Sequence, residues 1–393
     1  MRTAAATLIL LAGLSTGGVR AQKPVGPEVT PVTDVTDVTD VADVAGVTGV
    51  ADVTGVTDVT DEQRKNITPF SQVVGRNWTR WAGDQPSVTK INLIARIASP
   101  DFKGEDAAAL VAMEKVLRKV DSIDRAGAMA IQDPKILKLY EGNVLKLQGA
   151  KRVLFANGKP TFTLLQQGPP GDCYFFSGTG WMALYRPEVI VKAITPLPGD
   201  RYRVRFPNGD EAEVTSPTDA ELAINDSVST LQDGLWMSIL EKATGTIMSR
   251  TNAKGAAIPD PTVSIDRPGV PIRSIVERWT GRTPKNVPLG TRAKPRQVRE
   301  ALVLMEKRRL LAEALLLHKP AAKLPYDHVY AVLGFDGEND RVKLWNPWGT
   351  DFVPKGPSGR ENGYARDKGV FYLSLDEFIE FYTDMSVAAP TAR

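Results

Sequence analysis

Cysteine is almost absent from this chain, with a single residue, Cys173, among 393. One cysteine cannot form a disulfide within the chain, so a fold that depends on internal disulfides is excluded. A free thiol in an exported protein is typically reactive or pairs with another molecule. This scarcity therefore points to a chemical rather than a structural role for Cys173.

A strong charge of either sign is also absent, because the formal net charge is only +3. The balance is uneven: residues 30–62 hold eight acidic side chains and no Lys or Arg, which leaves +11 on the remainder. Spread over that length, +11 describes a solvated surface and predicts no nucleic-acid partner. No apolar run is long enough to span a bilayer, so we expect no membrane span in the mature chain.

The N-terminus has the pattern of an export signal. Arg2 supplies a positive charge, residues 4–14 form a short apolar stretch, and Val19-Arg20-Ala21 is a small-x-small cleavage site before Gln22. We therefore expect residues 1–21 to be a signal peptide, and the mature protein to be secreted or periplasmic.

Residues 22–62 are dominated by a repeat of ten triplets, Val-(Thr/Ala)-(Asp/Gly), which runs from Val32 to Asp61. A period of three fits neither a helix nor a strand. A segment without aromatic residues cannot bury enough surface to offset its ordering entropy. We expect a flexible acidic linker, with a repetitive stalk or adhesive tract as the alternative.

Residues 63–150 form a further region with helical signals. Within residues 106–120, apolar side chains recur near helical spacing, and charged residues such as Glu114 take the other face. Trp78 and Trp81 are candidates for anchoring this region on a larger body. The pattern fits a small helical domain, or a pro-segment that covers the cleft of the next domain.

From residue 151 onward, helical and strand patterns mix, which predicts an α+β domain over residues 151–393. The expected helices span 172–184, 231–243 with an end at Gly245, 295–307, and a last one capped by Ser374 or Asp376 that runs through Tyr382. The expected strands are the hairpin 202–206 and 211–215, the pair 329–335 and 341–345, and 370–373. Residues 309–318 suit either a helix or a strand.

Three residues can act together with Cys173: Gln167, His328 and Asn346. Gln, Cys, His and Asn in this order along one chain is the arrangement of papain-like thiol proteases. We expect Cys173 in the first turn of a helix, where the helix dipole and a neighbouring imidazolium lower its pKa. His328 then serves as the base and later protonates the leaving amine.

The remaining polar groups have supporting roles in this scheme. Asn346 orients the other nitrogen of the imidazole, and Trp348 shields that bond from water. Gln167, six residues before Cys173, donates its amide N–H to the oxyanion together with the Cys173 backbone N–H. His318 has no motif and is expected at the surface, whereas Trp236, Trp279 and Trp345 are expected in the core.

Five segments in order resemble the calpain family of cysteine proteases over roughly residues 154–387. Gln167–Cys173 resembles the family's Gln-Gly-x-x-Gly-Asp-Cys, residues 327–332 its Gly-His-Ala-Tyr-Ser-Val, and Asn346–Gly349 its Asn-Pro-Trp-Gly. Weaker similarities cover residues 235–243 and 369–378. The resemblance implies a papain-like fold with a helical lobe and a β-rich lobe, and it suggests calcium as a cofactor without indicating its ligands.

Two positions depart from the family pattern. Tyr174 follows the cysteine where the family has Trp, and Asp327 precedes the histidine where the family has Gly. The carboxylate of Asp327 either raises the pKa of His328 or faces solvent.

These observations predict an exported cysteine endopeptidase whose partner is a protein or peptide substrate. A transglutaminase-type acyl transferase is one alternative, although Asn346 stands where that class has an Asp. A catalytically inactive, protease-like binding or adhesion protein is the other, although Gln167, Cys173, His328 and Asn346 are all present.

Overall fold

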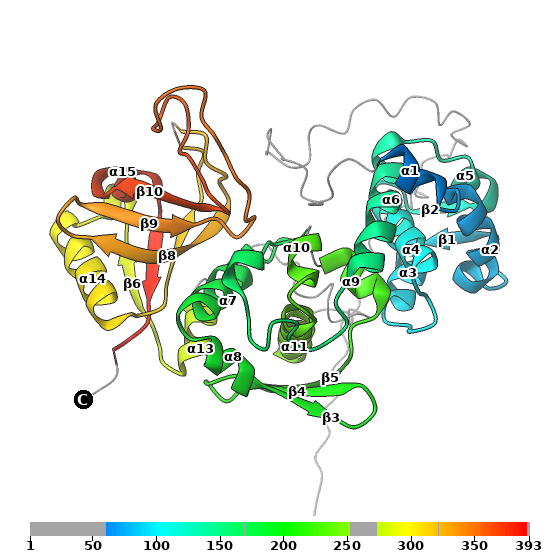
Figure 1. Cartoon of the computed structure of the whole chain (residues 1–393), viewed down its shortest axis with the longest axis horizontal. Coiled ribbons are helices and arrows are strands. Elements are labelled where there is room, and N and C mark those ends of the chain that lie inside the picture. The colour runs from blue at the N-terminus through cyan, green and yellow to red at the C-terminus, as the bar shows by residue number, and fades with distance from the viewer. Residues whose placement is uncertain (1–59, 169, 226, 252–272, 321, 391–393) are drawn as a thin grey trace, which may run out of the picture. The chain divides into compact units, whose positions relative to one another are not determined.

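The computed structural model is a mixed α+β structure (Figure 1), and it describes residues 60–168, 170–225, 227–251, 273–320 and 322–390. The predicted signal peptide and nearly all of the repeat lie outside these residues. The last triplet is described from Thr60 onward. Thr60 accepts a hydrogen bond from the Gln63 backbone and caps α1 (Asp61–Lys65). Helical structure therefore begins slightly before the predicted boundary at residue 63.

The N-terminal region is helical, as predicted. The elements after α1 are α2 (Phe70–Ala82), β1 (Ser87–Thr89), α3 (Lys90–Ile97), α4 (Glu105–Val116), β2 (Ser122–Asp124), α5 (Arg125–Met129) and α6 (Pro134–Gly149), with β1 and β2 paired antiparallel. Trp78 and Trp81, the candidates for anchoring this region on a larger body, are buried on α2. The expected polar face of α4 is wrong for Glu114, which is buried and pairs with Arg118 at 3.0 Å.

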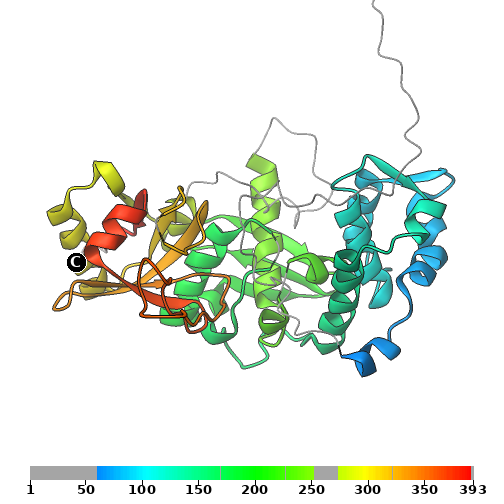
Figure 2. The ribbon, with the colours of Figure 1, turned by 90° about the horizontal axis from the view of Figure 1, so that it is seen from above.

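The N-terminal helices share a hydrophobic core with the helices that follow. Thr218 Oγ1 donates to the Ile97 carbonyl at 2.6 Å, and Lys146 Nζ donates to the Ala223 carbonyl at 2.7 Å, both within buried surroundings. α4 and α6 pack on α9 (Asp219–Asn225) (Figure 2). Apolar contacts and buried polar bonds therefore join this region to the rest of the helices.

The middle of the chain is mostly helical. Its elements are η1 (Phe162–Leu164), α7 (Cys173–Tyr185), α8 (Pro187–Ala193), β3 (Ile194–Leu197), β4 (Arg201–Arg205), β5 (Glu211–Thr215), α9, α10 (Val228–Leu231), α11 (Trp236–Thr251) and α13 (Arg273–Thr280). The predicted hairpin is β4 and β5, with Gly209 at a φ of +94° in its turn. The predicted helix end at Gly245 is wrong: burial of that residue offsets the roughly 1 kcal/mol propensity cost of glycine, and α11 continues to Thr251.

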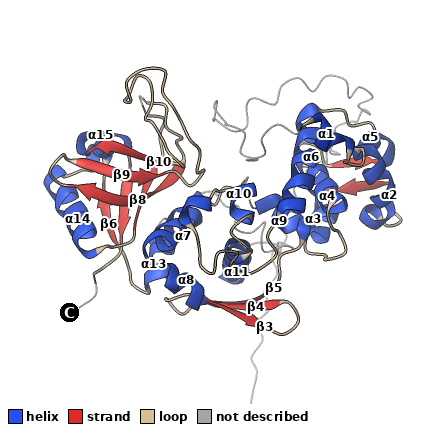
Figure 3. Cartoon of the chain, in the orientation of Figure 1, coloured by secondary structure: helices blue, strands red, loops and turns tan. Residues whose placement is uncertain are grey.

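The C-terminal part is built on a six-stranded antiparallel sheet with the order β10-β9-β8-β7-β11-β6 (Figure 3). Its elements are β6 (Lys285–Pro288), η2 (Gly290–Arg292), α14 (Pro295–Arg308), β7 (Ala312–Leu316), β8 (His328–Asp336), β9 (Arg341–Trp345), β10 (Val370–Ser374), α15 (Leu375–Phe381) and β11 (Asp384–Val387). The predicted strand pair and both helices are confirmed, and Ser374 caps α15 in a capping box with Glu377. The ambiguous segment 309–318 contains the strand β7.

Strand β8 separates the two hydrophobic cores. Val329, Ala331 and Leu333 belong to the core shared with the helices, whereas Tyr330 and Val332 belong to the core between the sheet, α14 and α15. This division follows from the alternation of side chains along a strand. The helices therefore cover one face of β8, and His328, the first residue of β8, lies at the edge of that contact.

Candidate active site

Cys173 is the first residue of α7, in agreement with the prediction. The backbone amides of Phe175 and Phe176 donate to the Asp172 carbonyl at 2.8 and 3.1 Å, which forms the first turn. Asp172 is the N-cap residue and is fully buried, but its side chain makes no capping bond. Backbone bonds therefore set the start of the helix and the position of the thiol.

One face of α7 lies against the strands that carry the other predicted residues. Ser177 Oγ donates to the Val329 carbonyl at 3.0 Å, and the Tyr185 hydroxyl donates to the Leu333 carbonyl at 2.6 Å. Between these bonds, Gly180 leaves room for the Trp345 ring, which a Cβ at that position would overlap. Because a small residue permits this close approach, α7 is held directly on β8 and β9.

His328 and Asn346 are joined by a hydrogen bond. Nε2 of His328 lies 2.8 Å from Oδ1 of Asn346, and both side chains are buried. The same Oδ1 accepts a bond from the Trp348 backbone N–H at 3.0 Å, which supports its assignment as the oxygen. Because a carbonyl oxygen only accepts, Nε2 carries the proton, and Nδ1 is the nitrogen that can exchange a proton with another group.

Aromatic rings surround the imidazole of His328. The centroid of the Trp348 ring lies 4.8 Å from that of the imidazole, and the Tyr330 ring meets it edge-on at 5.0 Å. Trp348 is half-buried whereas His328 and Asn346 are buried, so the indole covers their bond. Its shielding of that bond from water stays a prediction.

The Cys173 thiol lies beside the start of β8, because the backbone of Val329 hydrogen-bonds to it. The residue is half-buried, and desolvation raises the pKa of its thiol to about 12; a negative charge on Asp172 or on Glu313 raises it further. Burial lowers the pKa of His328 to about 4, against the effect of the bond to Asn346. The predicted lowering of the thiol pKa is therefore wrong, because desolvation outweighs the helix dipole and no imidazolium is present.

Gln167 is held next to the Asn346 segment by its backbone. Its N–H donates to the Pro347 carbonyl at 2.7 Å, and its side-chain Nε2 donates to the Pro170 carbonyl at 2.7 Å. The side chain is buried, and within the described residues its Oε1 has no hydrogen-bond partner. The amide nitrogen carries two hydrogens, and Pro170 takes one of them. The second can donate to an oxyanion, which is the predicted role.

The two departures from the calpain-like pattern have physical explanations. Asp327 has a φ of +52°, in the left-handed region that glycine adopts freely and Asp tolerates better than most residues. Its side chain is exposed, and the pKa of His328 is lowered rather than raised, so the solvent-facing alternative is the one observed. Tyr174 is buried, and its hydroxyl lies 3.5 Å from Sδ of Met248.

One ionisable residue near this site was missing from the predicted set. Glu313 on β7 is fully buried against α7, and a Cβ added to Gly178 would lie 3.0 Å from its Oε1. The signal in the sequence is weak but present, because Glu313 is the single charged residue in the apolar run of residues 310–317. Acidic side chains are almost never fully buried unless they are paired, so a Glu within a buried strand indicates a specific role.

The resemblance implies calcium as a cofactor, and the residues that the structure describes form no evident site for it. Among the residues that the structure describes, no group of three or more His, Cys, Asp or Glu side chains is placed to hold a metal ion. Asp172 and Glu313, the acidic residues at the site, are both fully buried. We therefore assign no step to calcium, and its involvement stays a prediction.

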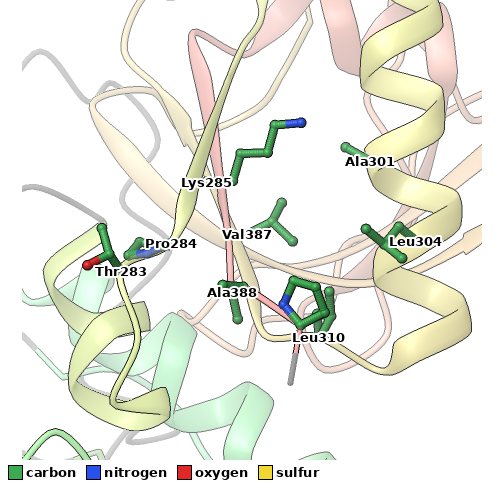
Figure 4. Close-up of a pocket in the computed structure, with 10 residues that line it drawn as sticks. Thr283, Pro284, Lys285, Ala301, Leu304, Leu310, Val387 and Ala388 are labelled. Atoms are coloured by element: carbon green, nitrogen blue, oxygen red, sulfur yellow. The ribbon is translucent and has the colours of Figure 1, made fainter. Parts of the chain in front are cut away.

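A pocket of about 410 Å³ lies elsewhere, between α14, β6 and the segment that follows β11 (Figure 4). Its lining consists of Thr283, Pro284, Lys285, Ala301, Leu304, Leu310, Val387, Ala388, Ala389 and Pro390. None of the predicted site residues lines it. This largely apolar pocket is therefore separate from the candidate site.

The start of α7, the His328–Asn346 pair and Gln167 supply a thiol, an oriented imidazole and an amide donor. These groups suit nucleophilic attack on a carbonyl carbon followed by acyl transfer. Comparison with protein-family models and with curated protein sequences gives no match for this chain. Within the described ranges, every helix is too short or too polar to cross a membrane. The function is therefore inferred from the residues and their geometry.

Proposed function

We propose that this chain is an exported cysteine-type endopeptidase, with a papain-like, calpain-type catalytic domain in residues 151–393. The observation that carries the proposal is the 2.8 Å bond between His328 and Asn346 next to the strand position that binds the Cys173 thiol. An amide in the third position orients the imidazole without adding a charge. This favours a protease over a transglutaminase-type enzyme, which uses Asp there.

Acylation begins when Sγ of Cys173 attacks the carbonyl carbon of the scissile peptide bond. Nδ1 of His328 takes the thiol proton as the S–C bond forms and an electron pair moves onto the carbonyl oxygen. The Gln167 amide and the Cys173 backbone N–H donate to that oxyanion. The C–N bond then breaks, His328 gives its proton to the leaving amine, and a thioester remains on Cys173.

Water completes the cycle. His328 takes a proton from the water as its oxygen adds to the thioester carbon, and breakage of the C–S bond returns the thiol with that proton. Desolvation raises the pKa of Cys173 and lowers that of His328, which favours the neutral form of both groups. In this proposal the imidazole takes the proton as sulfur attacks.

The two hydrophobic cores support a two-lobed reading of this domain. The helices around α7 carry Gln167 and Cys173, and the sheet carries His328 and Asn346. In this proposal the peptide substrate binds between them, where α7 meets the start of β8. Residues 1–21 act as the signal peptide that exports the enzyme.

The helices of residues 63–150 fit an integral part of the enzyme better than a removable pro-segment. The Lys146 ammonium donates to the Ala223 carbonyl, and Thr218 binds the Ile97 carbonyl, in buried surroundings. Removal of this region would expose a continuous hydrophobic core and leave these polar groups without partners.

The test is Cys173→Ala in the mature chain. Iodoacetamide labelling read by mass reports one site, because Cys173 is the only cysteine. We expect the substitution to abolish labelling and to lower peptide hydrolysis by at least about 10⁴-fold, with thermal unfolding unchanged. Persistent cleavage by the variant would refute the proposal.

The same preparation separates the alternatives. Incorporation of an added amine by the wild-type chain, in place of hydrolysis, would indicate acyl transfer of the transglutaminase type. Failure of a thiol-directed peptide inhibitor to label the folded wild-type chain would indicate an inactive binding protein. Labelling with and without a calcium chelator tests whether the ion assembles the site.

A further inference from the structure

Glu313 on β7 carries a fully buried carboxyl group that lies against α7. Helix α7 begins with Cys173, and the neighbouring strand β8 begins with His328. Its Oε1 lies 3.0 Å from the position that a Cβ on Gly178 would take. Glycine at this place leaves the backbone of α7 directly against the carboxyl group. The proposed protease reaction, on which this inference rests, has so far given Glu313 no role.

One contact of Glu313 favours its charged form, since the backbone of Gly178 acts on the carboxyl group to lower its pKa, but burial outweighs it. Among the described residues, no side chain donates a hydrogen bond to either carboxyl oxygen. Ser386 on β11 stands opposite Glu313 in the strand register, is fully buried, and its hydroxyl also has no partner there. Ile275 of α13 closes the site with apolar surface. An ionised carboxylate would be a buried, uncompensated charge, which is strongly unfavourable.

Two charged residues on the neighbouring elements, Arg278 and Asp384, are paired elsewhere. On α13, Arg278 pairs with Asp210 at 3.2 Å. On β11, Asp384 pairs with Arg292 at 2.9 Å. Arg278 is therefore engaged by Asp210, and Asp384, itself an anion, cannot compensate a negative charge on Glu313.

The two remaining elements are β8 and α7. On β8, Val329 and Ala331 face the helices and carry no charge. On α7, Cys173 is close enough for a charge on Glu313 to raise its pKa. Burial raises the pKa of Glu313 itself well above its ordinary value. The carboxyl group therefore holds its proton under conditions in which an exposed Glu has lost it.

We propose that Glu313 is a positioning residue that works in its protonated form and sets an alkaline limit to the reaction of Cys173. The neutral carboxyl group lets α7 rest on β7, which keeps the thiol beside Val329 and His328. Loss of the proton places a negative charge between the helix and the sheet. That charge weakens their contact and opposes formation of the thiolate.

The experiment compares the wild-type chain with Glu313→Gln, a neutral substitution of nearly the same shape. The rate of Cys173 alkylation by iodoacetamide, measured against pH, follows the thiolate fraction at a single site. We expect Glu313→Gln to react severalfold faster at the alkaline end, because removal of the Glu313 charge lowers the thiol pKa and increases the thiolate fraction. The kcat/KM for peptide hydrolysis should keep its plateau to a higher pH.

Glu300→Gln is the matched control, because Glu300 is an exposed carboxylate on α14 that pairs with Arg296. It should follow the wild-type curves. Glu313→Met, which is uncharged and of similar length, provides a second variant and should shift both curves as Glu313→Gln does. Circular dichroism and thermal unfolding at pH 7 identify the folded variants.

The outcomes separate this inference from the proposed function. Identical alkylation curves for wild type and the folded Glu313 variants would overturn the role of Glu313. Faster alkylation of those variants, with no hydrolysis by any chain, would support the role of Glu313 and refute the protease. A purely structural role would lower the unfolding temperature and leave the shape of the pH profile unchanged.

Discussion

The two halves of the candidate site are assembled in different ways. In the half on the sheet, the functional side chains bind one another, since His328 bonds to Asn346 at 2.8 Å and its ring contacts that of Trp348, with centroids 4.8 Å apart. In the half before and within α7, the functional groups bind backbone. The Gln167 amide donates to the Pro170 carbonyl, and the Cys173 thiol is bound by Val329.

This difference indicates where the site still has to change during a reaction. The imidazole already has its orientation and its tautomer, so that half needs no rearrangement. In the other half, a proton has to leave a thiol whose pKa is raised to about 12, and the Gln167 amide has to share its hydrogens with an oxyanion. We therefore expect substitutions in the Gln167 and Cys173 half to act mainly on the chemical step, and changes at His328 to act also on stability.

After loss of the thiol itself, removal of the oxyanion donor is expected to have the largest effect on hydrolysis. Gln167→Ala leaves the Cys173 backbone N–H as the remaining donor, and loss of one such donor typically lowers kcat by about 10² to 10³-fold. The measurement is kcat and KM for a peptide substrate, with the change expected in kcat. Alkylation of Cys173 by iodoacetamide forms no oxyanion, so its rate should stay within about twofold of wild type.

Gln297→Ala is the control for this substitution, since Gln297 is exposed on α14. It should leave both rates unchanged. A Gln167→Ala variant with wild-type kcat would contradict the assignment, because the amide would then serve only to bind Pro170. A parallel loss of alkylation would instead indicate that Gln167 positions the thiol.

Features with a local cause could be predicted from the sequence. Pro295 begins α14, Ser374 caps α15, and Gly209 forms the hairpin turn, each at the predicted place. The site residues belong to the same class, because motif order placed Cys173 at a helix start and His328 at a strand start. Short segments with strong turn or cap chemistry need no information from the rest of the chain.

Features with a tertiary cause could not be predicted in this way. The Leu and Ala residues of β7 favour a helix, and the segment is a strand because β8 and β11 pair with both of its edges. The thiol pKa was expected to be lowered from its position in α7, and burial, which sequence position does not show, raises it. Glu313 was missed for the same reason, since its importance comes from contact with α7.

Acid is expected to lower the free energy of unfolding through His328, in the half of the site on the sheet. The pKa of His328 is lowered to about 4 in the folded chain, from an ordinary value of 6.5. The unfolded chain therefore binds the proton first, so this stability is complete above about pH 6.5 and is lost as the pH falls toward 4. The expected loss is about 3 kcal/mol in the free energy of unfolding. Urea unfolding at pH 7, 6, 5 and 4 measures it.

Comparison of variants isolates this histidine from the carboxylates that titrate in the same range. His328→Gln should remove the difference of about 3 kcal/mol between pH 7 and pH 4, relative to wild type. His318→Gln, at an exposed position, should keep the wild-type slope. Equal slopes in wild type and His328→Gln would mean that the imidazole is not buried in a neutral state.

The smallest effect is expected where the two halves are tied together. Ser177→Ala removes the buried hydroxyl that donates to the Val329 carbonyl at 3.0 Å and leaves that carbonyl without this donor. The expected cost is about 1 to 2 kcal/mol in the free energy of unfolding. Ser249→Ala is the matched control, because that hydroxyl binds a carbonyl of its own helix at 3.0 Å, and its cost should be lower.

Hydrolysis by Ser177→Ala should fall less than about tenfold, because other contacts keep α7 on the sheet. The Tyr185 hydroxyl still binds the Leu333 carbonyl at 2.6 Å, and Gly180 still admits the Trp345 ring. If hydrolysis instead fell as far as in Gln167→Ala, a single hydroxyl rather than the packed face of α7 would align the thiol with His328. A small loss would show that the close approach at the glycines sets the alignment, and that the hydrogen bond adds stability to it.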